Sequence, residues 1–128
     1  MKNGLLLFCH GARDPNWARP FEAVMVRIRA LHPDTPVALA FLEFMSPGLV
    51  DAGQTLAAAG CDRVEVVPLF LGTGGHVRKD LPALMDTLRL AHPQVSWSVQ
   101  PSIGESPCVI AAMADAALAA MHTQRTSA

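Results

Sequence analysis

The stretch GLLLFCHGARD, residues 4–14, decides the fold. Its first six residues are a short run rich in leucine, and a polar segment that contains glycine follows at once. A run this short with such an ending is typical of a buried strand. His10 therefore comes directly after a strand, with only small residues beside it. The sequence predicts that this histidine is presented at the end of a sheet rather than buried within it.

Outward from this strand, short apolar runs alternate with longer amphipathic ones. We expect four strands, at 4–9, 36–43, 63–71 and 95–100, and four helices, at 17–31, 47–59, 80–91 and 107–122. Strands that alternate with helices indicate βαβ units, a parallel sheet and right-handed crossovers. The sequence predicts an α/β fold with helices on both faces, and a flavodoxin-like strand order of 2-1-3-4 would place the first strand at the centre.

Capping residues support the helix boundaries. Ser46 is expected to be the N-cap of the second helix, with Pro47 at its first position. Asp80 is expected to cap the third helix, with Pro82 in its first turn, and Ser106 to open the last. His32 and His92 are expected at helix C-termini, where the partial negative charge favours imidazolium, so neither belongs to the candidate site.

Length and composition indicate one domain. The chain has 128 residues, 51% of them hydrophobic, which is sufficient for one hydrophobic core. Its formal net charge of −1 provides no general electrostatic attraction to nucleic acid or to a membrane surface. We expect a single domain over 1–122 and a flexible tail at 123–128. Three cysteines without a CxxC pair are expected to be buried, reduced thiols, as in a cytoplasmic protein.

Two histidines and one acid are expected to meet at one edge of the sheet. His10 follows the first strand, Glu43 ends the second, and His76 is expected in the loop after the third. In a parallel sheet these positions share the carboxyl edge, where α/β proteins bind ligands. Two imidazoles and a carboxylate suit Co²⁺, Ni²⁺, Fe²⁺ or Zn²⁺ and leave coordination positions open. Either histidine could also act as a base near neutral pH.

The neighbouring residues suit a flat anionic ligand. Glycines in the stretch GTGG allow a close approach of the backbone and expose N–H groups, and cationic side chains match carboxylates. The residues are Gly72, Gly74, Gly75, Arg13, Arg78 and Lys79. Other interpretations stay open, because His10 could be a structural histidine, Glu43 a solvated strand end, and GTGG, which lacks any phosphate-binding fingerprint, a simple turn.

Three segments together resemble a known family. They are HGARDP after the first strand, FLE before a Ser-Pro helix start, and VVPLFLGTGGHVRKDLP. The chain resembles, from Leu5 to about Ala120, the small sirohydrochlorin chelatases of the class II chelatase superfamily. The third segment is the specific one. The family commonly has serine where this chain has Ala12, a change that leaves the expected metal ligands in place.

The resemblance implies a lyase that inserts a divalent metal, Co²⁺ first and Fe²⁺ or Ni²⁺ as alternatives, into sirohydrochlorin. This reaction serves cobalamin or sirohaem biosynthesis and uses no organic cofactor. The family's two active-site histidines fall on His10 and His76, and Glu43 matches its acidic residue. Larger relatives carry two such halves, which implies that this single half forms a homodimer. The metal and the tetrapyrrole are then both substrates of a cytoplasmic enzyme.

Two other functions remain open. A carrier of metal or tetrapyrrole without turnover would use the same ligands. A phosphohydrolase with His10 as nucleophile is the second, since histidine phosphatases also place His-Gly after the first strand. Their motif has arginine immediately before the histidine, whereas this chain has Cys9.

Overall fold

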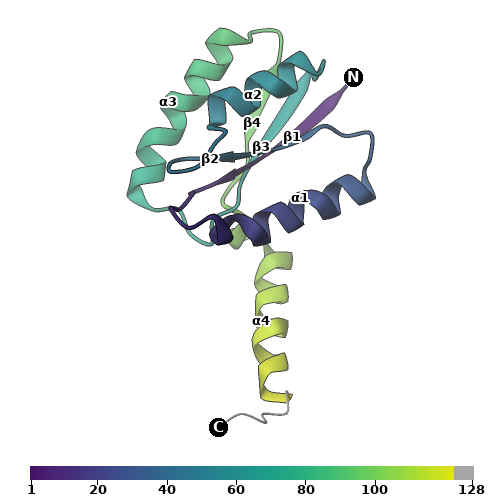
Figure 1. The fold of residues 1–128 in the computed structure, drawn as a ribbon, viewed down its shortest axis with the longest axis vertical. Helices are drawn as coiled ribbons and strands as arrows, with labels where there is room; N and C mark the ends of the chain where they lie inside the picture. Colours follow the sequence, from purple (N-terminus) through teal and green to yellow (C-terminus); the bar gives the residue numbers. More distant parts are fainter. Residues whose placement is uncertain (123–128) are drawn as a thin grey trace.

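A four-stranded parallel sheet forms the centre of the molecule. The structure is a computed structural model that describes residues 1–122, with all of their side chains except that of His76. The expected tail at 123–128 lies outside the described residues. The strands are β1 (Asn3–Cys9), β2 (Val37–Phe41), β3 (Arg63–Pro68) and β4 (Ser96–Val99), in the order β2-β1-β3-β4 (Figure 1). The predicted fold class and strand order are confirmed.

Helices cover both faces of this sheet. They are η1 (Pro15–Ala18), α1 (Arg19–Leu31), α2 (Leu49–Ala58), α3 (Gly75–Ala91), η2 (Ile103–Glu105) and α4 (Pro107–His122). The helices α2 and α3 pack on one face and α1 on the other. Figure 1 shows α4 leaving the domain as a separate arm. No helix in the described part of the chain combines the length and the apolar character needed to span a bilayer.

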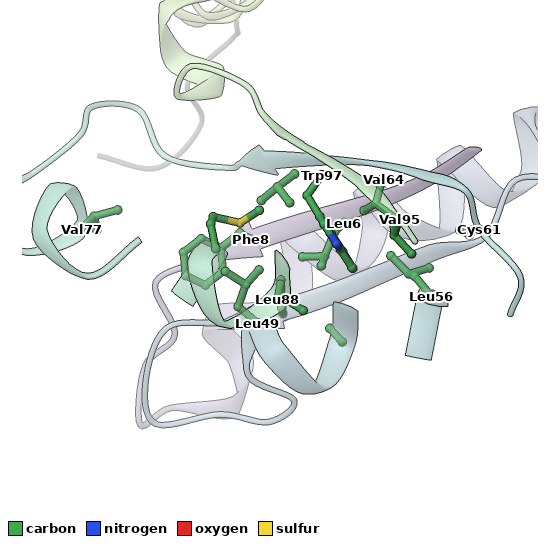
Figure 2. Close-up of a cluster of buried hydrophobic side chains, with 14 of the residues drawn as sticks. Leu6, Phe8, Leu49, Leu56, Cys61, Val64, Val77, Leu88, Val95 and Trp97 are labelled. Carbon is green, nitrogen blue, oxygen red and sulfur yellow. The ribbon is translucent and has the colours of Figure 1, made fainter. Parts of the chain in front are cut away.

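The larger core lies between the sheet and the pair α2 and α3. Side chains of alternate strand residues enter it, among them Leu6, Phe8, Val64 and Val66, each fully buried. Figure 2 shows Leu49 and Leu56 of α2 together with Leu88 of α3 and Trp97 of β4 in this cluster. The other face buries Leu7 and Cys9 beneath α1. Alternation along β1 thus supplies both cores, because successive side chains point to opposite faces.

Two predicted helix starts are wrong. The N-cap of α2 is Gly48 rather than Ser46, because the carbonyl of Pro47 still accepts a hydrogen bond of 2.9 Å from the N–H of Phe41 and so belongs to the turn. The N-cap of α3 is Gly74 rather than Asp80. Pro82 consequently lies inside α3 and not in its first turn. An interior proline has no N–H, so the helix lacks the hydrogen bond from position 82 to the carbonyl of Arg78.

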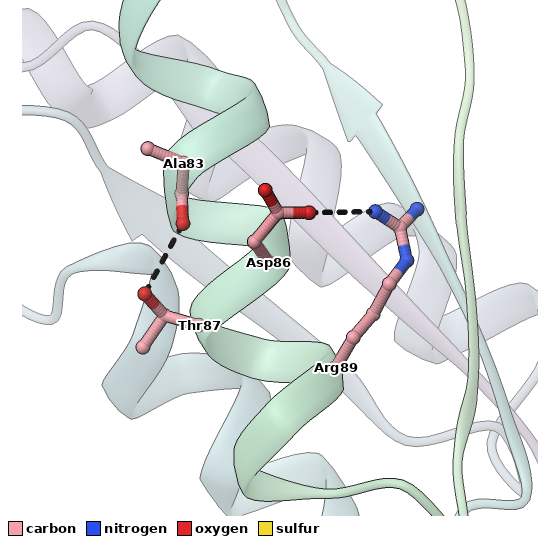
Figure 3. Close-up of polar contacts among 4 residues, drawn as sticks. All are labelled: Ala83, Asp86, Thr87 and Arg89. Atoms are coloured by element: carbon pink, nitrogen blue, oxygen red, sulfur yellow. Dashed lines mark hydrogen bonds and ion pairs between the residues drawn. The ribbon is translucent and has the colours of Figure 1, made fainter.

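Buried apolar residues hold α3 against the sheet, and the polar contacts drawn in Figure 3 lie at exposed residues. Figure 3 shows the hydroxyl of Thr87 donating to the carbonyl of Ala83 at 3.1 Å, and Arg89 beside Asp86 at 3.7 Å. Both side chains of this ion pair are exposed, so the pair contributes at most about 1 kcal/mol. Met85 and Leu88, at 1% and 0% exposure, carry the packing of α3 against the sheet.

Two of the three cysteines match the prediction. Cys9 and Cys61 are buried and free, and burial raises the pKa of both thiols, that of Cys9 to about 12. Cys108 is exposed on α4, so the prediction of a buried thiol is wrong there. The reason is that α4 does not pack into either core. The predicted positions of His32 and His92 are confirmed, since they are the C-caps of α1 and α3.

Candidate functional site

His10 lies at the carboxyl end of β1, which has β2 on one side and β3 on the other. Its ring is half-buried and rests on the ring of Phe70, with 4.2 Å between the centroids and a tilt of 37°. Phe70 is in turn held edge-on by Phe8 at 5.8 Å. One side of the imidazole is therefore supported by a buried aromatic pair. The histidine is positioned by the core but is not enclosed within it.

Gly11 brings the backbone of His10 against that of Glu43. Its φ is +89°, a conformation that residues with a Cβ rarely adopt, and a Cβ here would overlap the carbonyl oxygen of Glu43. The N–H of Glu43 donates to the carbonyl of His10 at 3.1 Å. Glu43 is exposed and lies two residues beyond the end of β2. The backbones of these two residues therefore lie side by side, and the meeting of their side chains stays a prediction.

His76 lies in the first turn of α3 and not in a loop, because α3 begins at Gly75. It follows β3, the neighbour of β1 on the other side from Glu43. Among the side chains that the structure describes, no three or more His, Cys, Asp or Glu residues form a group that could hold a metal ion. The side chain of His76 is outside that set, so the three-ligand site stays a prediction.

The segment after β3 that contains the stretch GTGG, residues 71–75, is called the glycine loop. It leaves open space beside the start of α3. A Cβ placed on Gly72, Gly74 or Gly75 would meet no atom within 4 Å. No side chain caps the N-terminus of α3, so its first N–H groups are available to an anion, and the helix dipole adds partial positive charge there. This geometry is compatible with the predicted binding of ligand carboxylates by Gly74 and Gly75.

The predicted cationic residues are exposed at the same edge of the sheet. Arg78 and Lys79 lie near the start of α3, and Arg13 follows β1. The guanidinium carbon of Arg13 lies 4.6 Å from the centroid of the Phe44 ring. A planar guanidinium that stacks in this way keeps its edge free to meet a carboxylate.

Sequence reasoning missed the apolar residues of this edge. Phe44 is 56% exposed with a φ of +67°, and Leu71 is 70% exposed. Each follows a strand that neighbours β1, the strand that His10 follows. These two side chains give this edge of the sheet an apolar character. An aromatic residue directly after Glu43, in the stretch FLEF, was the available signal. A rim that exposes large apolar side chains suits a large flat ligand.

A second missed feature is the contact between the glycine loop and η2. The hydroxyls of Thr73 and the buried Ser102 share a hydrogen bond, and the N–H of Gly104 donates to the carbonyl of Phe70 at 2.9 Å. Phe70 and Thr73 also line a hollow of about 400 Å³ between α3 and the end of β4. The segment that supports the His10 ring is thus attached to the base of α4.

The chain is similar in sequence to a known protein family and to curated proteins. The profile of the CbiX family matches residues 4–120. A sirohydrochlorin cobaltochelatase from Saccharolobus solfataricus is 36% identical over 85 residues, which are 64% of this chain and 62% of that protein. The matched part thus spans less than two thirds of the curated relative.

Solved structures extend the match to nearly the whole fold. A CbiX protein from Marinobacter aquaeolei VT8 superposes with a TM-score of 0.82 at 28% identity, covering 94% of this chain and 98% of that one. The sirohydrochlorin chelatase SirB from Bacillus subtilis subspecies spizizenii, in complex with cobalt, gives a TM-score of 0.75 at 26% identity and covers 93% of this chain but 51% of its own. From the profile match over 4–120, this chain belongs to the CbiX family.

Proposed function

We propose that this chain is a sirohydrochlorin chelatase, a lyase that inserts a divalent metal into the tetrapyrrole. The observation that carries the proposal is the junction of His10, Glu43 and Phe70 at the carboxyl end of the central strand. It offers an imidazole supported from one side, an adjoining carboxylate residue and an apolar rim. The chelatase names of its relatives support the same activity.

The metal would be held by His10, Glu43 and His76. Two imidazoles and a carboxylate leave coordination positions open, so the pyrrole nitrogens can replace the remaining ligands. Two pyrrole N–H protons must leave as the metal enters the ring. A histidine, or water on the metal, takes them up, since imidazole accepts protons near neutral pH. No organic cofactor is required by this scheme.

The macrocycle would be oriented by its periphery. Arg13, Arg78 and Lys79, with the amides of Gly74 and Gly75, would bind its carboxylates. Phe44 and Leu71 would contact its apolar parts. Fixing the ring over the metal removes much of the entropic part of the barrier.

Co²⁺ is the proposed metal, which would place the reaction in cobalamin biosynthesis. Fe²⁺ and Ni²⁺ suit the same ligands, and Fe²⁺ would serve sirohaem instead. We propose a cytoplasmic location on the basis of the reduced cysteines. We also propose a homodimer, because the chain matches only half of SirB.

Purified protein with sirohydrochlorin tests the activity. Initial rates with Co²⁺, Fe²⁺ and Ni²⁺ are recorded in parallel by the change in tetrapyrrole absorbance. His10→Ala and His76→Ala should each lower the rate at least about 100-fold if the residue binds metal or transfers protons. His32→Ala, at the exposed end of α1, is the matched control and should keep the full rate.

Two outcomes would contradict the proposal. If both histidine variants insert metal at the full rate, the assignment of His10 and His76 as metal ligands is wrong. Product that stops at one metal per protein would identify a carrier rather than an enzyme. We expect the unmodified chain to insert many metal ions per protein molecule. His10→Ala and His76→Ala should each lose this turnover.

A further inference from the structure

Ser102 is a buried polar residue whose hydroxyl is not used by its own helix. It is the N-cap of η2, and only 4% of it is exposed. A serine at a helix N-cap ordinarily accepts a hydrogen bond from an N–H of the first turn, but the side chain of Ser102 makes no such bond. Its hydroxyl is hydrogen-bonded instead to the hydroxyl of Thr73, 29 residues earlier in the chain. Ser102 therefore links η2 to a segment that is distant in sequence.

Thr73 lies in the glycine loop and has its only polar side chain. Because glycine has the greatest backbone freedom of any residue, a loop of this composition is not fixed by its own sequence. A Cβ placed on Gly72, Gly74 or Gly75 would meet no atom within 4 Å, and the side chain of Leu71 is 70% exposed. The bond from Thr73 to Ser102 is thus the side-chain contact that can fix the middle of the loop.

The segment that carries Ser102 is itself firmly attached to β3 and to the residues after it. The N–H of Gln100 donates to the carbonyl of Val66 at 2.9 Å, and the N–H of Gly104 donates to the carbonyl of Phe70, also at 2.9 Å. Ser102 lies between these two bonds along the chain. Its hydroxyl is therefore presented to the glycine loop from a fixed backbone.

The loop in turn determines where the first turn of α3 lies. Gly74 is the N-cap of α3, and its carbonyl accepts a hydrogen bond of 3.1 Å from the N–H of Arg78. Pro82 has no N–H, so the bond from position 82 to the carbonyl of Arg78 is missing. The first turn is consequently joined less tightly to the rest of α3. Its position depends more on the glycine loop that precedes it.

We propose that Ser102 is a positioning residue of the candidate site, which acts through Thr73 to fix the glycine loop at the start of α3. The N–H groups of Gly74 and Gly75 then meet a ligand carboxylate in one geometry. Donors that are already ordered bind an anion more tightly, because less backbone freedom is lost on binding. The inference rests on the proposed function for the ligand, since the carboxylates are those of sirohydrochlorin. Its first test needs no ligand.

Amide hydrogen exchange, followed by NMR on the unmodified chain and its variants, tests whether Ser102 fixes the loop. Ser102→Ala removes the hydroxyl. The N–H of Arg78 should then exchange at least about fivefold faster, as expected when one hydrogen bond is lost and its partner is left unpaired. The N–H of His92, which bonds to the carbonyl of Leu88 at 2.9 Å at the other end of α3, is the internal reference and should keep its rate.

Threonine variants separate this bond from a general loss of stability. Thr73→Val removes the same bond from the other side, so it should act as Ser102→Ala does, and the double variant should show no larger effect. Thr73→Ser keeps a hydroxyl and should retain the exchange rates of the unmodified chain. Thr87→Val is the matched control, because it removes a threonine hydroxyl that bonds within α3, to the carbonyl of Ala83. It should leave the N–H of Arg78 unaffected.

Binding of sirohydrochlorin without metal, followed by absorbance titration, tests the consequence for the site. Ser102→Ala and Thr73→Val should each raise the dissociation constant at least about fivefold. Thr73→Ser and Thr87→Val should bind as the unmodified chain does. Circular dichroism at the temperature of the titration should show all four variants folded, so that weaker binding reports the loop and not unfolding.

Three results would overturn the positioning role. An unchanged exchange rate of the Arg78 N–H in Ser102→Ala would show that the bond does not fix the loop. Equally faster exchange at Arg78 and His92 would show a general loss of stability. Faster exchange at Arg78 alone, with unchanged binding of sirohydrochlorin, would show that the loop does not position the ligand. If the unmodified chain does not bind sirohydrochlorin, the proposed function is wrong, and the exchange rates still decide whether Ser102 fixes the loop.

Discussion

The backbone N–H of Glu43 donates a hydrogen bond of 3.1 Å to the carbonyl oxygen of His10. This bond continues the pairing of β1 with β2 past the last strand residues, since Leu42 donates to Cys9 in the same way at 2.8 Å. It holds an imidazole and a carboxylate on adjoining backbone at the edge of the sheet. The position of Glu43 relative to His10 is therefore set by the sheet itself and not by contact between their side chains.

Gly11→Ala should damage both the fold and the site. A left-handed backbone costs an alanine roughly 1–2 kcal/mol, and the added Cβ would overlap the carbonyl of Glu43. We expect a loss of at least about 2 kcal/mol in the free energy of unfolding, measured by urea denaturation. Gly72→Ala is the control, because its Cβ meets open space. Equal stability of the two variants would show that the close approach is not required.

Phe70→Leu should disturb His10 while preserving the fold. The leucine keeps the site apolar but loses both ring contacts, to His10 at 4.2 Å and to Phe8 at 5.8 Å. We expect a loss of about 1–2 kcal/mol in stability and a larger fractional loss in chelation rate. The imidazole signals of His10 in an NMR spectrum should shift. Unchanged signals would show that Phe70 does not support the ring.

The sequence was sufficient for the strand order and for the place of His10. The run GLLLFC and the glycine after it report a buried strand and its end, and these are local signals. The start of α3 was predicted too late, because Asp80 and Pro82 resemble a helix start. The helix begins instead at Gly75, with Gly74 as an N-cap that makes no side-chain hydrogen bond. Local helix propensity alone does not predict that a helix starts in this glycine-rich stretch.

Features that depend on contacts distant in sequence could not be predicted. The stacking of His10 on Phe70 and the bond between Thr73 and Ser102 join segments whose spacing has no pattern. The exposure of α4 is a further example, since its apolar residues look like those of a buried helix. The convergence of His76 with His10 stays a prediction from sequence.

Gly104→Ala should reveal whether η2 and the candidate site move together. A Cβ at this position would overlap the backbone of Leu71, so the glycine loop and η2 would be forced apart. Because the N–H of Gly104 also bonds to Phe70, we expect lower chelation rates as well as reduced stability. Stability is measured by urea denaturation and chelation by absorbance. A variant with reduced stability but a normal chelation rate would show that the position of η2 does not affect the candidate site.

Alkaline pH should destabilise the protein through Cys9. Burial raises the pKa of this thiol from 9.0 to about 12 in the folded state. Above pH 9 the unfolded chain releases the proton while the folded chain retains it, so unfolding becomes more favourable as pH rises. The loss is about 1.4 kcal/mol per pH unit between these two values. Cys9→Ala should flatten this part of the pH profile of urea stability, and an unchanged slope would assign it to other groups.

Phe44→Gly should stabilise the fold and weaken the binding of the tetrapyrrole. Phe44 holds a φ of +67° while 56% of it is exposed, so it gains little packing for a conformation that glycine adopts freely. We expect up to about 1 kcal/mol of added stability and weaker binding of sirohydrochlorin, measured by absorbance titration without metal. The variant also removes the ring that Arg13 stacks on. Phe44→Leu separates the two effects, because it keeps an apolar side chain and the strained backbone. If the leucine variant binds as the unmodified chain does, an apolar contact suffices; if Phe44→Gly binds equally well, this residue is not part of the site.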